Sequence, residues 1–237
     1  MNMLLLVPED FIGPDRVRIS GRRHRQLHDV IRAEPGKRCR AGIFNGPVGG
    51  AVVTAISPEE TELTVECMLP PPPKQPIALV VALPRPKTFL KVLHAAVTMG
   101  VGRICFLECW KVDKSYWSSP VLTPEPLRET LRLALEQCCD PVMPEVIFRR
   151  RFKPFVEDEL RSYAGTSRIL LAHPGVDAPP PAGPVGETTL LIGPEGGFTE
   201  YEVAALEAQG AYSFSLGPRI LRTEVAVPAL LSRLMRS

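Results

Sequence analysis

The sequence predicts an α/β protein in which a parallel sheet, covered by helices on both faces, follows a smaller β-rich domain. Three observations support this fold class. Apolar strands alternate with amphipathic helices over 77–237, a pattern that produces parallel sheets. Short strands separated by Gly and Pro dominate residues 1–69. A proline-rich segment at 70–76 lies between the two patterns and is expected to form a semi-rigid linker.

The β-rich domain is expected to contain one helix followed by strands. Ser20 can cap the helix, and Pro35 with Gly36 ends it. Apolar side chains recur within it at helical spacing, at Leu27, Val30 and Ile31. The strands expected after it are 38–44, 51–56 and 62–68. Strands of this kind can form a small barrel that carries one basic helix.

The larger domain is expected to alternate strand and helix along its whole length. The expected strands are 77–83, 103–108, 145–148, 168–172, 188–192 and 212–216. The main helices before the last two strands are 86–99 and 124–138. Proline is best tolerated in the first turn of a helix, so Pro228 predicts that the last helix begins no earlier than about Val225.

Basic residues are concentrated in one segment although the net charge is only +2. Residues 16–40 hold nine basic and two acidic side chains. Such a patch attracts a polyanion such as RNA, and a solvated surface of mixed charge is the alternative. Arg149-Arg150-Arg151 with Lys153 is either a second RNA contact or a solvated helix start.

The six cysteines are expected to be reduced thiols in a cytoplasmic protein. The apolar run within residues 1–7 is too short for a signal peptide or a membrane span, so no membrane association is expected. Cys105 and Cys109 have a loose metal-ligand spacing, but no second pair stands at a matching interval. The sequence therefore predicts no metal site.

The first candidate binding loop is Gly193-Pro194-Glu195-Gly196-Gly197, directly after an apolar strand. Its glycines permit close approach of a ligand to main-chain amides, and Thr199 with Glu202 forms a capping box at the next helix. The loop lacks the lysine of a P-loop, and the Glu195 carboxylate would repel phosphate. An uncharged or cationic ligand, such as a sulfonium-bearing cofactor, fits better. A tight turn without a ligand is the alternative.

The second candidate loop covers residues 217–224, after the strand that follows. Apolar Ile220 and Leu221 can line a flat pocket for a purine ring, and three charged residues lie beside them: Arg219, Arg222 and Glu224. In a parallel sheet, ligands bind beyond the carboxyl ends of the strands, so the two loops are expected to share one site. A surface loop with solvated arginines is the alternative.

Together the two loops resemble those of the bacterial 16S ribosomal RNA uridine N3-methyltransferases, the RsmE family of the SPOUT superfamily. The resembling motifs are Gly193-Pro194-Glu195-Gly196-Gly197-Phe198 and Leu216-Gly217-Pro218-Arg219-Ile220-Leu221-Arg222-Thr223-Glu224. Weaker similarity extends over the rest of the chain, including His24 to Gly36, Leu93 to Val101 and Leu135-Glu136-Gln137.

The resemblance implies a fold, a cofactor and partners. The fold would be a PUA-like RNA-binding β-barrel at 1–69 and a trefoil-knotted, SPOUT-type α/β domain at 77–237. The cofactor would be S-adenosylmethionine, and the partners would be 16S ribosomal RNA or the small ribosomal subunit and a second copy of the chain in a homodimer. The implied cofactor-binding residues are Leu171, Ile192, Gly193, Pro194, Glu195, Gly196, Gly197, Leu216, Gly217, Ile220 and Leu221. The expected RNA-binding residues are Arg22, Arg23, Arg25, Arg32 and Arg219.

Two residues are candidates for the chemistry of methyl transfer to N3 of uridine, which carries a proton that must leave. Glu224 could accept that proton, and Arg222 could stabilise the developing uracil anion. Alignment of the methyl donor with the base could supply most of the rate instead.

The chain departs from the family pattern outside the two loops. The departures are Val225, Pro228, Thr98-Met99 and Cys139-Asp140. They leave open an RNA-binding ribosome-assembly factor that keeps the fold without catalysis. A phosphate-binding nucleotide enzyme is disfavoured by Glu195 and by the missing P-loop lysine.

Overall fold

The computed structural model describes residues 2–181 and 186–235, which form two compact units. Unit 1 consists of Met1–Pro73 together with Leu131–Met143, and unit 2 consists of Lys74–Thr130 together with Pro144–Ser237. The expected domains, 1–69 and an uninterrupted 77–237, therefore need a correction. The segment Leu131–Met143, which follows the linker by more than fifty residues, belongs to the first unit.

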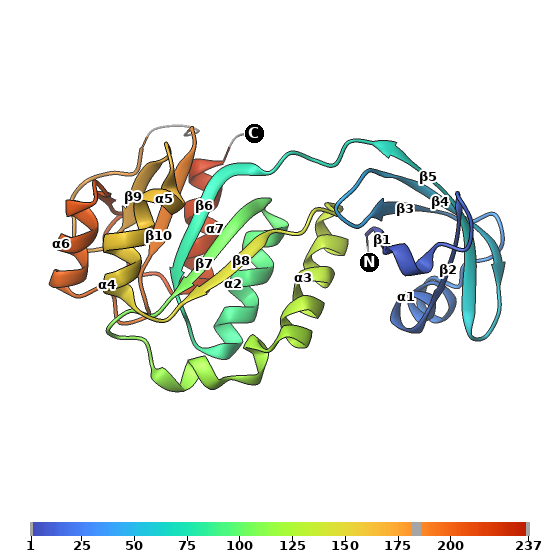
Figure 1. Ribbon diagram of the computed structural model, residues 1–237, viewed down its shortest axis with the longest axis horizontal. Helices are drawn as coiled ribbons and strands as arrows, with labels where there is room; N and C mark the ends of the chain where they lie inside the picture. Colours follow the sequence, from blue (N-terminus) through green and yellow to red (C-terminus); the bar gives the residue numbers. More distant parts are fainter. Residues whose placement is uncertain (1, 182–185, 236–237) are drawn as a thin grey trace. The chain divides into compact units, whose positions relative to one another are not determined.

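Unit 1 is built on a five-stranded sheet of order β1-β3-β4-β5-β2 (Figure 1). The pairing of β1 with β3 is parallel, and the other pairings are antiparallel. Apolar residues from all five strands form its core with Leu27 and Ala33. The elements of unit 1 before the linker are β1 (Leu4–Leu6), a 3-10 helix (Pro8–Asp10), β2 (Arg16–Ser20), α1 (Gly21–Arg25), a π-helical segment (Gln26–Ile31), β3 (Arg38–Ile43), β4 (Val48–Ile56) and β5 (Glu60–Leu69).

The helix of unit 1 begins after Ser20 as predicted, but it ends earlier. Its second half is π-helical, and Arg32 takes a left-handed φ of 52° directly after Ile31. Leu27 is buried, whereas Val30 is 67% exposed. A π-helix has more residues per turn than an α-helix, so the α-helical spacing of the apolar residues does not place all three on the core.

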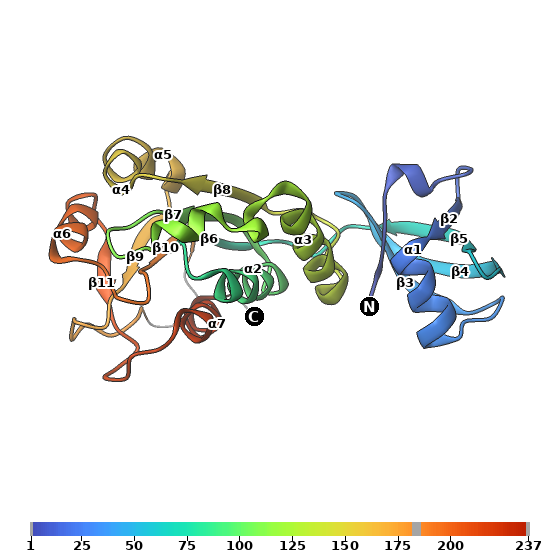
Figure 2. The same cartoon turned by 90° about the horizontal axis from the view of Figure 1, so that it is seen from below.

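Unit 2 is built on a six-stranded, all-parallel sheet of order β11-β9-β10-β6-β7-β8. This confirms the predicted α/β class. Helices α2 and α7 cover one face, and α4 and α5 cover the other (Figures 1 and 2). The elements after the linker are β6 (Gln75–Ala82), α2 (Pro86–Thr98), β7 (Val101–Leu107), 3-10 helices (Lys114–Ser118 and Pro120–Leu122), α3 (Pro124–Cys138), β8 (Glu145–Arg149), α4 (Phe152–Pro154), a π-helical segment (Phe155–Glu159), α5 (Leu160–Ala164), β9 (Arg168–Ala172), β10 (Thr188–Ile192), α6 (Glu200–Ala208), β11 (Tyr212–Phe214) and α7 (Thr223–Leu234).

The last strand and the last helix differ from their predictions. Strand β11 ends at Phe214, because Ser215 donates its amide to the carbonyl of Ala178 at 2.8 Å and leaves the sheet. The prediction that helix starts near Val225 is wrong: α7 begins at Thr223, and Pro228 lies inside it. Proline at this depth removes the amide that would bond the carbonyl of Glu224.

Candidate functional site

Three loops of unit 2 converge because the strands before them are parallel neighbours. Strand β9 lies between β10 and β11, with Leu171 opposite both Leu191 and Ser213. The carboxyl ends of the three strands therefore share one edge of the sheet. The loops that leave this edge begin at His173, Gly193 and Ser215, and the last two of them are the pair that the sequence predicts to share one site.

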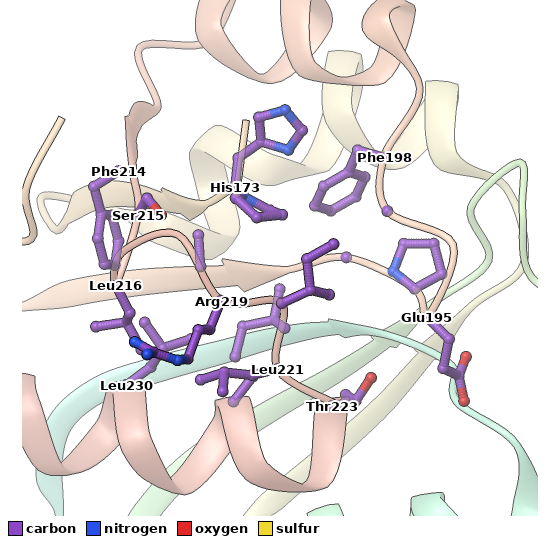
Figure 3. Close-up of a pocket in the computed structure, with 18 of the residues that line it drawn as sticks. His173, Glu195, Phe198, Phe214, Ser215, Leu216, Arg219, Leu221, Thr223 and Leu230 are labelled. Carbon is purple, nitrogen blue, oxygen red and sulfur yellow. The ribbon is translucent and has the colours of Figure 1, made fainter. Parts of the chain in front are cut away.

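The loops enclose a pocket of about 730 Å³, part of which is open to solvent (Figure 3). Residues of α7 close its remaining side. The lining residues are Ala172, His173, Pro174, Ile192, Gly193, Pro194, Glu195, Gly197, Phe198, Phe214, Ser215, Leu216, Gly217, Arg219, Ile220, Leu221, Thr223, Ala226 and Leu230.

Packing and hydrogen bonds fix the first loop. The amide of Gly197 donates to the carbonyl of Pro194 at 2.8 Å and closes a turn. A Cβ on Gly193 would lie 2.9 Å from the ring of the buried Phe198, so close packing of this ring requires glycine there. Thr199 and Glu202 form the predicted capping box at the start of α6. The loop is a fixed wall of the pocket.

The carboxylate of Glu195 is engaged by Arg85 at the start of α2. The Oε1 atom lies 3.5 Å from Arg85 Nε and accepts the Arg85 amide at 3.3 Å. In Figure 3 the Glu195 side chain points away from the centre of the pocket. The expected repulsion of phosphate by Glu195 is therefore weaker than the sequence implies. The missing P-loop lysine still argues against a phosphate site.

The second loop exposes apolar surface toward the pocket. Ile220 is 82% exposed, and Leu216 and Leu221 are also exposed although all three line the pocket. The Ser215 hydroxyl bridges the amide of Gly217, at 3.1 Å, and its carbonyl, at 3.0 Å. Large exposed apolar side chains are suited to contact with an apolar ring of a ligand.

Most of the predicted cofactor residues line the pocket, and two lie behind it. Gly196 is not among the lining residues, and its carbonyl accepts Lys111 Nζ at 2.8 Å. Leu171 is fully buried in β9, one residue before the lining residue Ala172.

Neither candidate for the chemistry lines the pocket. Arg222 is exposed at the N-cap of α7, where its carbonyl accepts the amides of Val225 at 2.9 Å and Ala226 at 2.8 Å. Glu224 is partly buried, and its Oε1 atom lies 3.9 Å from Lys91 Nζ on α2. Both residues flank Thr223, which lines the pocket.

Several residues that line the pocket are hard to recognise as site residues from the sequence alone. The position of His173 after a strand is compatible with the rim of the pocket or with a capping role, and among the described residues its buried Nδ1 atom has no hydrogen-bond partner. The sequence pattern indicates only ordinary apolar or capping residues at Phe214, Thr223 and Leu230. Only the folded chain shows that they border the same cavity.

Ion pairs engage many of the basic residues in the N-terminal patch. Glu136, which is 3% exposed, accepts two hydrogen bonds of 2.9 Å from Arg22, and the buried Asp10 accepts two of 2.6 Å from Arg23. The guanidinium groups of Arg22 and Arg23 neutralise buried carboxylates of unit 1, and RNA binding by these two residues stays a prediction. Arg25, Arg32 and Arg219 are exposed.

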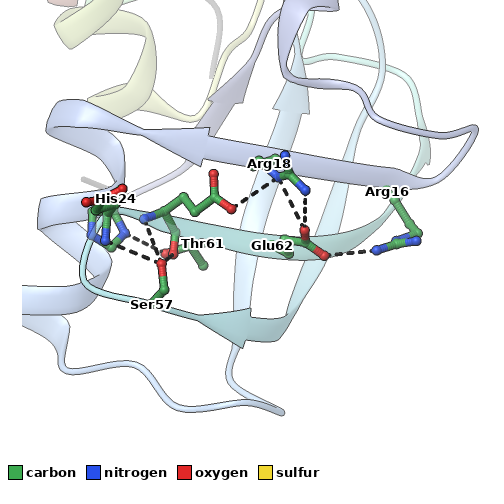
Figure 4. Close-up of polar contacts among 8 residues, drawn as sticks. Arg16, Arg18, His24, Ser57, Thr61 and Glu62 are labelled. Carbon is green, nitrogen blue, oxygen red and sulfur yellow. Dashed lines mark hydrogen bonds and ion pairs between the residues drawn. The ribbon is translucent and has the colours of Figure 1, made fainter.

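Arginines of strand β2 also form ion pairs with a carboxylate, here at the surface (Figure 4). Glu62 on β5 lies 2.9 Å from Arg16 and 2.8 Å from Arg18, and these guanidinium groups, Arg18 first, hold its pKa below the usual value. His24 is buried close by, with its ring nitrogens 2.8 Å from the Thr61 hydroxyl and 3.1 Å from the Pro58 carbonyl. The polar groups here hold the sheet and the helix together.

The last candidate site is a metal site at Cys105 and Cys109, and the structure does not support it. Burial raises the pKa of Cys105 to about 12 and that of Cys109 well above its usual value, so both are neutral thiols at pH 7. Over 2–181 and 186–235, no group of three or more His, Cys, Asp or Glu side chains is placed to hold a metal ion. In the same residues no helix has the length and apolar character needed to span a bilayer.

Unit 2 is a parallel α/β domain with an open, largely apolar pocket at the carboxyl ends of its strands. This arrangement is typical of α/β proteins that bind a small-molecule ligand. Residues 71–235 match the model of the RNA methyltransferase domain, and the chain belongs to this family. The family resemblance carried by the two loops is thereby confirmed.

The similar proteins include the ribosomal RNA small subunit methyltransferase E of Treponema pallidum (strain Nichols). It is 25% identical over 244 residues, which cover 97% of this chain and 88% of that protein. The structure of the protein of the same name from Neisseria gonorrhoeae, bound to S-adenosyl methionine, is similar with a TM-score of 0.75 and 20% identity, over 98% of this chain and 95% of that chain. A putative methyltransferase from Legionella pneumophila, in complex with the cofactor SAM, has a TM-score of 0.74 and 22% identity with the same coverage.

Proposed function

We propose that this protein transfers a methyl group from S-adenosylmethionine to N3 of a uridine in 16S ribosomal RNA. The observation that carries the proposal is the pocket: both family-specific loops line it, beside a third loop that begins at His173. The named relatives of the family act on ribosomal RNA of the small subunit according to their names. The site of action would then be the cytoplasm.

The residues of the pocket fit the proposed cofactor. Exposed Ile220 and Leu221 offer apolar contact for a purine ring, and the unpaired Nδ1 of His173 offers one buried hydrogen-bonding atom. S-adenosylmethionine, when bound, supplies an electrophilic methyl group.

The proposal assigns the proton chemistry to residues that flank Thr223. Glu224 would accept the N3 proton, and Arg222, which is free to move at the surface, would stabilise the anion on a uracil oxygen. Lys91 Nζ, which lies 3.9 Å from Glu224 Oε1, would compensate the negative charge of Glu224 before the uracil base binds. Because neither residue lines the pocket, the RNA would bring its base to them at the pocket mouth.

We propose the remaining family features on the same basis. The β-rich unit 1 would be the PUA-like RNA-binding domain, with Arg25 and Arg32 as its exposed phosphate contacts. The connections of the 193–222 region would form the trefoil knot, and the protein would act as a homodimer. Sedimentation of the purified chain tests the dimer directly.

A non-catalytic assembly factor remains the competing function. Two of the departures from the family pattern are structurally mild: Val225 is 48% exposed, and the Thr98 hydroxyl bonds the carbonyls of His94 at 2.9 Å and Ala95 at 3.1 Å within its own helix. Neither change obstructs the pocket. An assembly factor would bind RNA without binding the methyl donor.

Methyl transfer onto isolated 16S RNA and onto small subunits from a strain that lacks the modification tests the proposal. With methyl-labelled S-adenosylmethionine, we expect 3-methyluridine in the nucleosides separated by mass spectrometry. Arg222→Ala and Glu224→Gln should lower turnover at least tenfold while calorimetry shows unchanged cofactor affinity. Label in another nucleoside would refute N3 specificity, and absence of cofactor binding would favour the assembly factor.

A further inference from the structure

One aromatic side chain outside the pocket is exposed in a way that its surroundings do not explain. Trp110 follows β7, whose carboxyl end lies at the same edge of the sheet as the pocket loops, and it is 84% exposed. A tryptophan can bury about 150–250 Å² of surface, so leaving it in water forgoes a large stabilisation. The other tryptophan, Trp117, is 9% exposed.

The backbone beneath Trp110 is held in place. Its amide donates to Glu202 Oε1 at 2.7 Å, and Glu202 is 2% exposed. The second oxygen of Glu202 accepts the Thr199 amide at 2.8 Å at the start of α6. The indole is therefore presented from a fixed loop.

Lys111 joins the same loop to the wall of the pocket. Its Nζ atom donates to the carbonyl of Gly196 at 2.8 Å, and its stem packs on Gly196. Trp110 is thus attached at two points to the segment 196–202, which runs from the pocket to α6. A base stacked on the indole would lie next to the mouth of the methyl-donor pocket.

Cations surround this loop on the same edge of the sheet. Arg150 follows β8, and its guanidinium carbon lies 5.4 Å from the ring centre of Trp117, which belongs to the same loop as Trp110. The ring of Phe152 lies 6.4 Å from the ring of the pocket-lining Phe198, and Arg151 directly precedes Phe152 in the chain. Within the described ranges, none of these four cations forms an ion pair with a carboxylate: Lys111, Lys114, Arg150 and Arg151.

We propose that Trp110 is a stacking platform for an unpaired base of the RNA substrate, with Lys111, Lys114, Arg150 and Arg151 contacting the phosphates beside it. Exposed aromatic rings with nearby cations bind single-stranded nucleic acid in this way. The proposal deepens the proposed function, because it rests on an RNA substrate and names the residue that holds a base near the site.

The experiment uses the intrinsic fluorescence of the full chain. Trp117→Phe removes the buried indole, whose Nε1 atom has no hydrogen-bond partner in 2–181 and 186–235, and leaves Trp110 as the single tryptophan reporter. The probes are decauridylate and an abasic ribose-phosphate strand of equal length. We expect saturable quenching with decauridylate and no quenching with the abasic strand, since only a base can stack.

Substitutions separate stacking from charge. In the natural background, Trp110→Ala should weaken decauridylate binding, followed by fluorescence anisotropy of a labelled strand, about tenfold, and Trp110→Phe should retain most of the affinity. Lys114→Ala and Arg151→Ala should reduce the salt dependence of binding and keep the quenching. Tyr212→Ala is the matched control, because Tyr212 is 47% exposed at the amino end of β11, on the opposite edge of the sheet.

The two proposals can fail separately. Equal quenching by both probes, or unchanged decauridylate affinity in Trp110→Ala, would overturn the stacking proposal. Calorimetry should show unchanged binding of S-adenosylmethionine in Trp110→Ala, because the loop is held through the backbone amide of Trp110. Methyl transfer to a base other than uridine would refute the proposed function and leave the stacking result intact.

Discussion

At the scale of single residues, burial of the partner decides what an arginine does. Asp10 is 6% exposed and Glu136 is 3% exposed, so each needs a cation to offset the loss of water around its carboxylate. Arg23 and Arg22 supply these cations. Both lie on α1, in the basic segment that the sequence predicts to bind RNA. Arg25 lies on the same helix without a buried partner. The sequence shows where the basic residues are concentrated, but not which of them pair.

Arg23→Ala is expected to destabilise unit 1 by about 3 kcal/mol, since breaking a buried pair leaves an uncompensated carboxylate. The Arg23 side chain also donates to the carbonyl of Leu5 at 2.7 Å. Urea unfolding measures the loss, and Arg25→Ala, at an exposed position of the same helix, should change stability by less than about 0.5 kcal/mol. If both variants were equally stable and only Arg23→Ala lost RNA binding, Arg23 would be an RNA contact and not a residue that stabilises unit 1.

His173 offers a second test at this scale, because its Nδ1 atom is buried without a partner. His173→Phe keeps a planar ring and removes that atom. We expect the unliganded protein to be at least as stable, since no hydrogen bond is lost, and S-adenosylmethionine to bind about tenfold more weakly. Thermal unfolding and calorimetry measure the two effects. Unchanged cofactor affinity would show that the ligand does not use this nitrogen.

At the scale of elements, the sequence predicts regular structure well where one face or both faces are buried. The bounds of α3, β9 and β10 agree with their predictions, because apolar periodicity and flanking turns mark them clearly. Strands β1 and β2 are not predicted. The first has only three residues, and the second, Arg16–Ser20, alternates polar and apolar residues as a half-buried strand does, a signal that the prediction did not use.

The loop between β10 and α6 contains glycines that are needed for different reasons. Gly193→Ala would place a methyl group 2.9 Å from the ring of Phe198, which is buried and cannot move aside. Gly197 has open space around it but a φ of +71°. We therefore expect Gly193→Ala to deform the pocket wall, at a cost of about 1–3 kcal/mol, and Gly197→Ala to cost about 1 kcal/mol through backbone strain alone.

Calorimetry with S-adenosylmethionine separates the two substitutions. Gly193→Ala should weaken binding at least tenfold, because the shifted Phe198 itself lines the pocket. Gly193→Ala combined with Phe198→Leu should recover part of the affinity, since the smaller side chain relieves the contact. No recovery would indicate that the methyl group obstructs the ligand directly.

At the scale of the whole molecule, the division into units cannot be read from local patterns. The proline-rich segment correctly marks the end of the β-rich pattern, yet Leu131–Met143 belongs to unit 1. Helix α3 is a single periodic segment, so nothing in its sequence shows that its second half packs with a different unit. The contacts that assign it are long-range, such as the hydrogen bond of 3.1 Å from the Met3 amide to the Glu136 carbonyl.

The same long-range contacts predict the behaviour of a chain cut in the linker. With a protease site inserted at 70–73, the cleaved pieces are expected to stay together, because Leu131–Met143 remains part of unit 1. Asn45 adds two hydrogen bonds to that segment: its amide donates to the Pro141 carbonyl at 3.0 Å, and its side chain accepts the Met143 amide at 2.8 Å. Gel filtration at micromolar concentration should show one species of the original size.

Glu136→Ala is expected to weaken that association by at least tenfold, because two charge-assisted hydrogen bonds from Arg22 are lost, each worth about 1.5–3 kcal/mol. Glu125→Ala is the control on the same helix, since its carboxylate is 80% exposed and pairs with Arg128, three residues along. Sedimentation of the cleaved proteins measures both. Separation of the natural sequence after cleavage would mean that the linker, rather than the packing of Leu131–Met143, holds unit 1 to the rest of the chain.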